Sequence, residues 1–274
     1  MLKLKPRLLL LALAAGLPLA AQAHMTWLLP NLTQLNGKEP VVSVDAVVSE
    51  DLFIFERALK LETLRITAPD GRALEVEGRS SARHRESFDL KLSQDGTYRI
   101  SHISQSLFGS YKLAGETKRF RSTAATLDKD LPAGAELLAL TQAVNRQQTF
   151  VSKEAPGRVA FAPEGQGLEF LPLGAVTDLS HGDQTRFRLL LDGQPVADAA
   201  VKLVREGNRH RYKLGDLTLK TDAQGEFTVA WSEPGRYWLG ATVGERPAPG
   251  ASSGTRQAPL KRASLSATFE VLPK

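Results

Sequence analysis

Past residue 30 the sequence alternates between short segments rich in β-branched and aromatic residues and turns built on glycine, proline and aspartate. In such turns proline presets φ and glycine supplies a positive φ, so each one reverses the chain between two strands. No segment sustains the 3.6-residue period of an amphipathic helix over several turns. Turns of this type occur at 69–71, 94–96, 192–195, 222–225 and 233–235. The pattern predicts an all-β protein built from sandwiches.

Two segments leave room for a helix. Residues 136–153 form a long stretch that we interpret as a strand because of its Thr, Val and Phe content, with a helix over 135–147 as the alternative. Residues 121–130 are compatible with a short helix capped by Ser122 and ended by Leu131-Pro132.

The strands divide into two groups at the Gly- and Pro-rich stretch that surrounds residues 155–167. We expect two tandem Ig-like or prealbumin-like β-sandwich domains, over residues 24–170 and 171–274. Residues 245–260, rich in Pro, Gly, Ser and Ala, are expected to form a long hairpin loop in the second domain.

Residues 1–23 have the three parts of a signal peptide. A basic start is followed by an apolar run over residues 8–19 that is shorter than the roughly 20 residues of a membrane span, and Ala21-Gln22-Ala23 has the small-x-small form of a cleavage site. No cysteine follows for lipid attachment and no twin arginine precedes. We therefore expect export by the Sec pathway to the periplasm, with cleavage after Ala23 and no membrane span afterwards.

The charge balance and the absence of cysteine limit the classes of function that the sequence supports. Three of the 35 Lys and Arg residues lie in the expected signal, which leaves 32 basic against 30 acidic residues, and this balance does not indicate nucleic-acid binding. With no cysteine, the exported protein has no disulfides and relies on its hydrophobic cores. Any transition-metal site has to use His, carboxylate, Met or backbone nitrogen ligands.

The expected cleavage makes His24 the first residue of the mature chain. An N-terminal histidine offers its α-amine and its imidazole Nδ1 to one metal ion, so that one residue closes a chelate ring suited to Cu(II) or Ni(II). The alternative is that His24 is only the residue at which the peptidase cuts. Trp27, Leu28 and Pro30 predict an ordered first strand, which would hold this terminus in place.

The other histidines are His84, His102, His181 and His210, and no two of the five have a metal-motif spacing. We select His102 as the second ligand, because it lies on a predicted strand face with Tyr98 and Ile100 and a strand position is rigid. Taken alone, His102 is a half-buried histidine with a hydrogen-bond partner.

Catalytic motifs are absent from the sequence. It contains no Gly-x-Ser-x-Gly elbow, no His-Glu-x-x-His pair and no phosphate-binding glycine loop, and its acidic residues are scattered over turns. We expect a protein that is not an enzyme and that takes no organic cofactor.

Several motifs resemble a bacterial periplasmic family known as domain of unknown function 4198. They are spread over nearly the whole mature chain and comprise His24-x-x-Trp27-Leu28-x-Pro30, Ser49-Glu50-Asp51-Leu52-Phe53, 66–71, 111–116, 167–172, 191–196 and 221–227 running on to 235–238. Members of this family are often described as periplasmic components of cobalt or nickel uptake, and the resemblance implies such a role here. The C-terminal half also resembles transthyretin-like or carboxypeptidase-regulatory sandwiches, whose motifs concern the fold alone.

Three functions follow as hypotheses. The first is a periplasmic accessory to metal uptake that binds Ni(II), Co(II) or Cu(II) through His24 and acts with a transporter or an outer-membrane receptor. The second is an interaction module of two sandwiches that binds a periplasmic or outer-membrane partner, with His24 incidental. The third and weakest is a copper histidine brace acting on polysaccharide, which requires a second histidine beside His24 on a flat surface.

Overall fold

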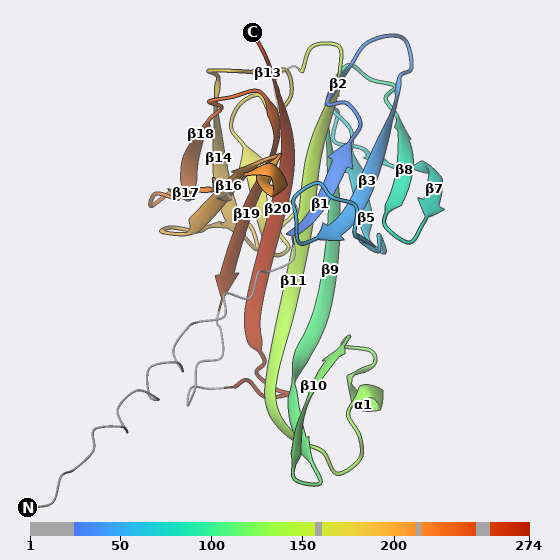
Figure 1. The fold of residues 1–274 in the computed structure, drawn as a ribbon, viewed down its shortest axis with the longest axis vertical. Coiled ribbons are helices and arrows are strands. Elements are labelled where there is room, and N and C mark those ends of the chain that lie inside the picture. Colours follow the sequence, from blue (N-terminus) through green and yellow to red (C-terminus); the bar gives the residue numbers. More distant parts are fainter. Residues whose placement is uncertain (1–24, 157–160, 212–214, 245–252) are drawn as a thin grey trace, which may run out of the picture.

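The computed structural model describes residues 25–156, 161–211, 215–244 and 253–274, and almost all of its regular structure is β (Figure 1). The strands in the first half are β1 (Met25–Pro30), β2 (Gln34–Leu35), β3 (Val41–Ser49), β4 (Arg57–Ala58), β5 (Leu64–Thr67), β6 (Ala73–Leu74), β7 (Glu77–Ser81), β8 (Glu86–Lys91), β9 (Gly96–Leu113), β10 (Glu116–Ser122) and β11 (Glu136–Lys153). Those in the second half are β12 (Leu168–Pro172), β13 (Leu179–Ser180), β14 (Gln184–Leu191), β15 (Gln194–Pro195), β16 (Ala200–Arg205), β17 (Leu217–Lys220), β18 (Glu226–Ala230), β19 (Gly235–Gly244) and β20 (Leu260–Leu272). The described helices are α1 (Leu127–Asp130) and the 3₁₀ turn η1 (Asn208–His210).

In the described residues these strands form three sheets. A central sheet has the order β17-β16-β19-β20-β11-β9-β5-β6. Three more strands belong to it: β10 pairs with β9, β13 with β20 and β2 with β11. An N-terminal sheet has the order β1-β3-β8-β7 with β4 on β3, and a C-terminal sheet has the order β12-β14-β15 with β18 on β14. The central sheet therefore contains strands from both halves of the chain.

The other two sheets cover opposite faces of the central sheet. Successive residues of a strand point to opposite faces, so Val151 of β11 packs with Tyr98 and Ile100 under the N-terminal sheet, while its neighbour Phe150 packs in the core under the C-terminal sheet. We call the face that carries Tyr98 and Ile100 the front face and the face that carries Phe150 the rear face. The two hydrophobic cores correspond to the two expected sandwiches, which share one sheet.

The predicted all-β fold is confirmed, and residues 136–153 form the strand β11 rather than a helix. The short helix is smaller than expected, because residues 116–122 pair with β9 as β10. Helix α1 begins at Leu127 after Thr126, so the prediction of Ser122 as its N-cap is wrong. The expected domain boundary at 170/171 falls inside β12, and the expected 245–260 loop lies largely outside the described residues. In the part of the chain that the structure describes, no helix has the length and apolar character needed to cross a membrane.

Strand β1 is ordered, as its apolar residues predict. Trp27 and Leu28 are fully buried, the indole Nε1 of Trp27 donates to Ser49 Oγ (3.0 Å), and the ring lies edge-on to Phe53 and Phe55. β1 pairs with β3 in a register that runs from Met25 opposite Ser49 to Pro30 opposite Val44. The start of the described chain is therefore held against the body of the protein.

Replacing Phe269 with Ala is expected to lower the free energy of unfolding by about 3–5 kcal/mol, because this buried ring contacts Phe150, Phe187 and Trp231 in the rear core. The control is Leu272→Ala on the same strand, where the side chain is 43 % exposed and a change within about 0.5 kcal/mol is expected. Urea unfolding of the two variants measures both. Equal losses would show that the rear core does not depend on this aromatic cluster.

Candidate functional site

The first residues of β1 are fixed to the front face of the central sheet by side-chain hydrogen bonds. The carbonyl oxygen of Thr26 accepts from Trp238 Nε1 (3.1 Å) and from Ser266 Oγ (2.6 Å), and Thr26 Oγ1 accepts from Gln147 Nε2 (2.9 Å). Two residues further along β1, the Leu28 carbonyl accepts a hydrogen bond from Thr268 Oγ1 (2.5 Å). These bonds fix Thr26 and Leu28 of β1 against the central sheet.

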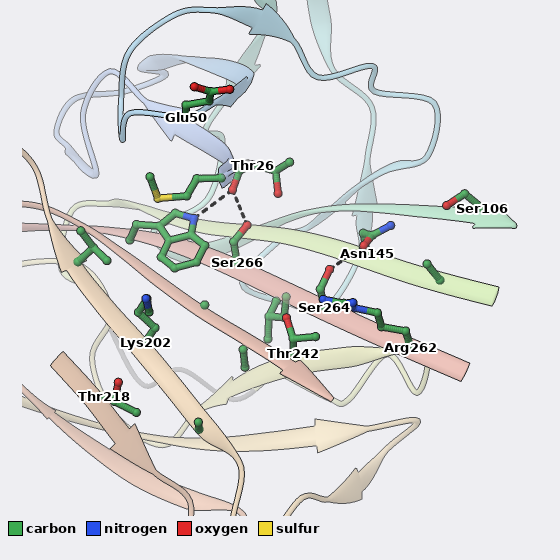
Figure 2. A pocket seen from close by; sticks show the side chains of 18 of the residues that line it. Thr26, Glu50, Ser106, Asn145, Lys202, Thr218, Thr242, Arg262, Ser264 and Ser266 are labelled. Carbon is green, nitrogen blue, oxygen red and sulfur yellow. Dashed lines mark hydrogen bonds between the residues drawn. The ribbon is translucent and has the colours of Figure 1, made fainter. Parts of the chain in front are cut away.

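A groove of about 870 Å³ opens on the front face beside Thr26 (Figure 2). Its walls and floor come from β1, β9, β10, β11, β16, β17, β19 and β20, the segment after β3 and η1. The residues that line it are Met25, Thr26, Glu50, Asp51, Ser106, Phe108, Arg121, Ala143, Asn145, Ala200, Lys202, Val204, Asn208, Thr218, Trp238, Gly240, Ala241, Thr242, Arg262, Ser264, Leu265 and Ser266. This volume lies in the range of sites for small organic ligands.

The floor of the groove is made of small and polar side chains in register on neighbouring strands. Asn145, Ser264 and Thr242 stand side by side on β11, β20 and β19. The Trp238 ring lies against Gly240, where an added Cβ would be 2.0 Å from Cη2 of the indole. Glycine at 240 thus lets Trp238 lie flat enough to reach the Thr26 carbonyl.

The two ends of the groove differ in charge. Glu50 and Asp51 lie at the β1 end, and their backbone amides donate to the Glu56 carboxylate at 3.0 and 3.4 Å, which fixes this turn. Lys202 is opposite Gly240 and level with Ser266, and its ammonium group pairs with Asp216 (2.8 Å). Arg262 and Arg121 line the groove further along the strands, so the carboxylates of Glu50 and Asp51 lie beside β1 and the two guanidinium groups lie toward the other end.

Of the two predicted metal ligands, His24 lies outside the described residues. It is bonded directly to Met25, whose side chain lines the groove, and Met25 pairs with Ser49, the residue before Glu50. Glu50 is not among the ligands predicted from the sequence, although it lies in the motif at 49–53. The pairing of β1 with β3 brings Glu50 beside Met25 at the groove.

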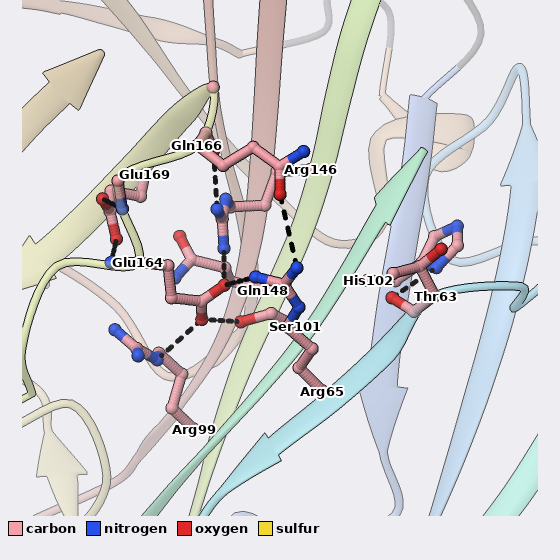
Figure 3. Close-up of polar contacts among 12 residues, drawn as sticks. Thr63, Arg65, Arg99, Ser101, His102, Arg146, Gln148, Glu164, Gln166 and Glu169 are labelled. Atoms are coloured by element: carbon pink, nitrogen blue, oxygen red, sulfur yellow. Dashed lines mark hydrogen bonds and ion pairs between the residues drawn. The ribbon is translucent and has the colours of Figure 1, made fainter. Parts of the chain in front are cut away.

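His102 is on the front face, as predicted, but it is almost fully buried, at 1 % exposure. Its Nδ1 donates to the Thr63 carbonyl (3.3 Å), so in the neutral ring Nε2 carries the lone pair, and this atom has no hydrogen-bond partner in the described structure (Figure 3). The residue opposite His102 on β11 is Gln147, which holds Thr26. His102 is thus one strand away from the anchor of β1, and its role as a ligand stays a prediction.

The remaining histidines, His84, His181 and His210, are exposed. His84 contacts the Glu56 carbonyl through Nδ1 (2.9 Å), and η1 ends at His210. Within the described ranges, no group of three or more His, Cys, Asp or Glu side chains is arranged to hold a metal ion.

Burial lowers the pKa of His102, and the hydrogen bond to Thr63 and the charges of Glu62 and Glu86 oppose this shift only in part. The folded protein thus holds His102 neutral, so stability is expected to fall as the pH drops below the unfolded value near 6.5, by at most about 1.4 kcal/mol per pH unit.

His102→Leu is expected to reduce this pH dependence between pH 7.5 and 5, as measured by urea unfolding at both values. The control His210→Ala, at an exposed site, should keep the wild-type difference. An unchanged pH dependence in His102→Leu would contradict the assignment.

A buried charge cluster occupies the rear face behind the groove (Figure 3). The Glu164 carboxylate pairs with Arg146 (2.6 Å) and Arg99 (3.1 Å) and accepts from Ser101 Oγ (3.0 Å), and Arg146 also donates to the Gln166 carbonyl (2.7 Å). Arg146 is fully buried. These contacts fasten the segment before β12 onto β9 and β11.

The electrostatics of this cluster favour the ionised form of Glu164. Burial raises its pKa, but the charges and hydrogen bonds of Arg146, Arg99 and Ser101 outweigh that effect, and the net pKa is lower than its usual 4.5. The stabilisation is therefore present in full above about pH 4.5 and is lost as the pH falls through the lower folded value.

Glu164→Gln is expected to cost about 3–5 kcal/mol at pH 7, because it leaves Arg146 buried without a counter-charge. The difference from wild type should narrow at acidic pH, where wild-type Glu164 becomes protonated. Glu39→Gln, which removes the exposed pair with Lys91, is the control and should change stability by less than about 1 kcal/mol. Denaturant titration at pH 7 and pH 3.5 measures both, and a loss that does not depend on pH would argue against the ion pairs.

The structure is thus an all-β protein with a groove of mixed charge beside β1. The chain belongs to the family described as "Domain of unknown function (DUF4198)", whose model matches residues 21–245. The predicted family membership is thus confirmed. No curated protein matches the sequence.

Among solved structures, the chain is similar to trypsin-activated alpha-2-macroglobulin from Escherichia coli, with 13 % identity, a TM-score of 0.24, and coverage of 90 % of this chain and 16 % of that one. It is also similar to the Yersinia pseudotuberculosis adhesin InvE, with 10 % identity, a TM-score of 0.21, and coverage of 89 % and 58 %. The chain thus spans about a sixth of the macroglobulin. Likenesses with TM-scores this low carry no argument about fold or function.

Proposed function

We propose that this protein is an exported, non-enzymatic metal-binding accessory of the periplasm that binds one Ni(II), Co(II) or Cu(II) ion at its mature N-terminus. The ligands are the α-amine and imidazole of His24, which cleavage after Ala23 exposes, and carboxylate oxygen from the segment after β3. A partner in metal uptake, such as a transporter or an outer-membrane receptor, then receives the ion.

The observation that carries this proposal is the anchoring of β1. Three hydrogen bonds hold Thr26, and Met25 pairs with Ser49. Ser49 is the last residue of β3, and the next residue, Glu50, lines the groove together with Met25, so we propose the Glu50 carboxylate as the further ligand. A tethered terminus is also a better chelator than a free one, since its conformational entropy is already reduced.

The donor set fits a borderline divalent transition metal. Two nitrogens from one residue with carboxylate oxygen nearby suit Ni(II), Co(II) or Cu(II) in tetragonal or octahedral geometry. Met25, which also lines the groove, adds a thioether that suits Cu(I). His102, the other predicted ligand, has an unpaired Nε2 and lies opposite Gln147, whose side chain donates to Thr26.

A second candidate function is an interaction module, and the β9–β10 hairpin favours it. This hairpin and α1 extend beyond the sandwiches at one end of the molecule (Figure 1). Strand β10 is largely exposed and carries Lys118, Arg119 and Arg121. Such an exposed basic edge suits an acidic partner surface, and in this reading His24 is incidental.

The test compares correctly processed protein with a form that carries one additional glycine before His24. Isothermal titration with Ni(II) or Cu(II) is expected to give one site for the processed protein and at least tenfold weaker binding for the extended form, because the glycine converts the α-amine into an amide. Affinity should also fall as the pH drops through the imidazole range, where the ligand becomes protonated. Equal affinity of the two forms would exclude the proposed site.

Glu50→Gln separates the site from a simple terminal chelate. The change removes the charge of the proposed carboxylate ligand, so we expect a several-fold weaker Ni(II) affinity than wild type. Glu39→Gln, at an exposed carboxylate outside the groove lining that pairs with Lys91, is the control and should bind as wild type. If Glu50→Gln binds Ni(II) as tightly as the control variant, Glu50 is not a ligand and only the His24 chelate of the proposal remains.

A further inference from the structure

The groove is much larger than a metal ion requires. A transition-metal ion and its ligands meet at bond lengths of about 2.0–2.3 Å, whereas this groove has a volume of about 870 Å³ and extends along several strands. We propose that the groove binds the metal together with a small polycarboxylate chelator, so that the bound species is an anionic metal complex of the citrate type. This inference rests on the proposed metal function.

The first argument is the donor character of the floor. Ser264 Oγ donates to Asn145 Oδ1 (2.6 Å), which orients the Asn145 amide and leaves its two N–H groups directed away from that bond (Figure 2). Asn145 and Ser264 lie one pleat repeat, about 6.6 Å along the strands, beyond the pair of Gln147 and Ser266 that holds Thr26. The amide N–H groups of Asn145 therefore lie near Thr26 and can donate to a carboxylate of a ligand in the groove.

The second argument is the guanidinium at the next position. Arg262 is one pleat repeat beyond Ser264 on the same face of β20, and it lines the groove. Arginine binds carboxylates with a planar pair of donors. With Arg121 further along the wall, the groove presents successive donors that match several carboxylates on one small molecule.

The third argument is the opposite charge at the β1 end. Glu50 and Asp51 disfavour a free polyanion there, but they favour the cationic centre of a metal complex. A ligand with a cation at one end and carboxylates at the other satisfies both ends together. Neither a bare metal ion nor a free carboxylic acid does so.

A carbohydrate fits this groove less well. The Trp238 indole, its most evident sugar platform, lies against Gly240 and uses its Nε1 to hold Thr26. Its role is therefore to fix β1, and Phe108 is the other aromatic residue among those that line the groove.

The experiment is equilibrium dialysis of processed protein against radiolabelled citrate, with and without one equivalent of Co(II) or Ni(II). We expect at least tenfold tighter retention of citrate when the metal is present. Asn145→Ala and Arg262→Gln should each weaken retention of the metal–citrate complex several-fold, while binding of the metal alone in citrate-free buffer stays within twofold of wild type. The matched control Arg256→Gln removes an arginine outside the groove that pairs with Asp128, and it should bind as wild type.

Three results would overturn the inference. Citrate retained equally without metal would identify a simple anion site. Metal retained while citrate stays in the dialysate would identify a site for the ion alone, and the proposed function would stand without this extension. Failure of both the metal alone and the complex to bind would overturn the proposed function as well. Thermal unfolding of each variant shows whether a loss of binding reflects loss of the fold.

Discussion

The alternation of side chains along the central sheet is the constraint on which the rest of the structure depends. Residues one apart on β11 enter different cores, Val151 on the front and Phe150 on the rear. The N-terminal sheet covers one part of the front face and the C-terminal sheet covers one part of the rear face. The two covering sheets lie on opposite faces of the central sheet and toward opposite edges of it. Each face of the central sheet is therefore covered only in part.

On the rear face, the open part is closed by the segment that leads into β12. Glu164 accepts charge-assisted hydrogen bonds from arginines on β9 and β11, and Glu169 accepts from the backbone amides of Glu164 and Gly165 at 2.9 and 3.1 Å. A connection that would otherwise be a flexible linker is thus fixed by buried charge. The two sandwiches become a single unit through this segment and through the shared strands.

On the front face, the open part becomes the groove. Beside Met25 and Thr26 of β1 the sheet presents Ser, Asn, Thr and Gly together with apolar residues such as Phe108 and Ala143. The hydrogen bonds that stabilise β1 also hold Thr26 at the edge of this groove. Fold stability and the proposed ligand site therefore depend on the same hydrogen bonds to Thr26. The bond from Trp238 is possible because its ring packs against Gly240.

The sequence by itself determined the strands, the turns and the family. Period-two patterns and Gly or Pro turns are local signals, and they predicted the all-β class, the ordered strand at Trp27 and the strand over 136–153. It also led to the hypothesis that His24 is a chelator, because that property would belong to one residue and its terminus. It did not show that the halves share a sheet, since the parallel pairing of β11 with β20 joins residues over 100 positions apart. Nor did it connect Glu50, Asn145 and Ser264 with the chain start. Such residues resemble ordinary polar positions on strands and turns until the register of β1, β11 and β20 brings them to one surface, and that register is decided by tertiary packing.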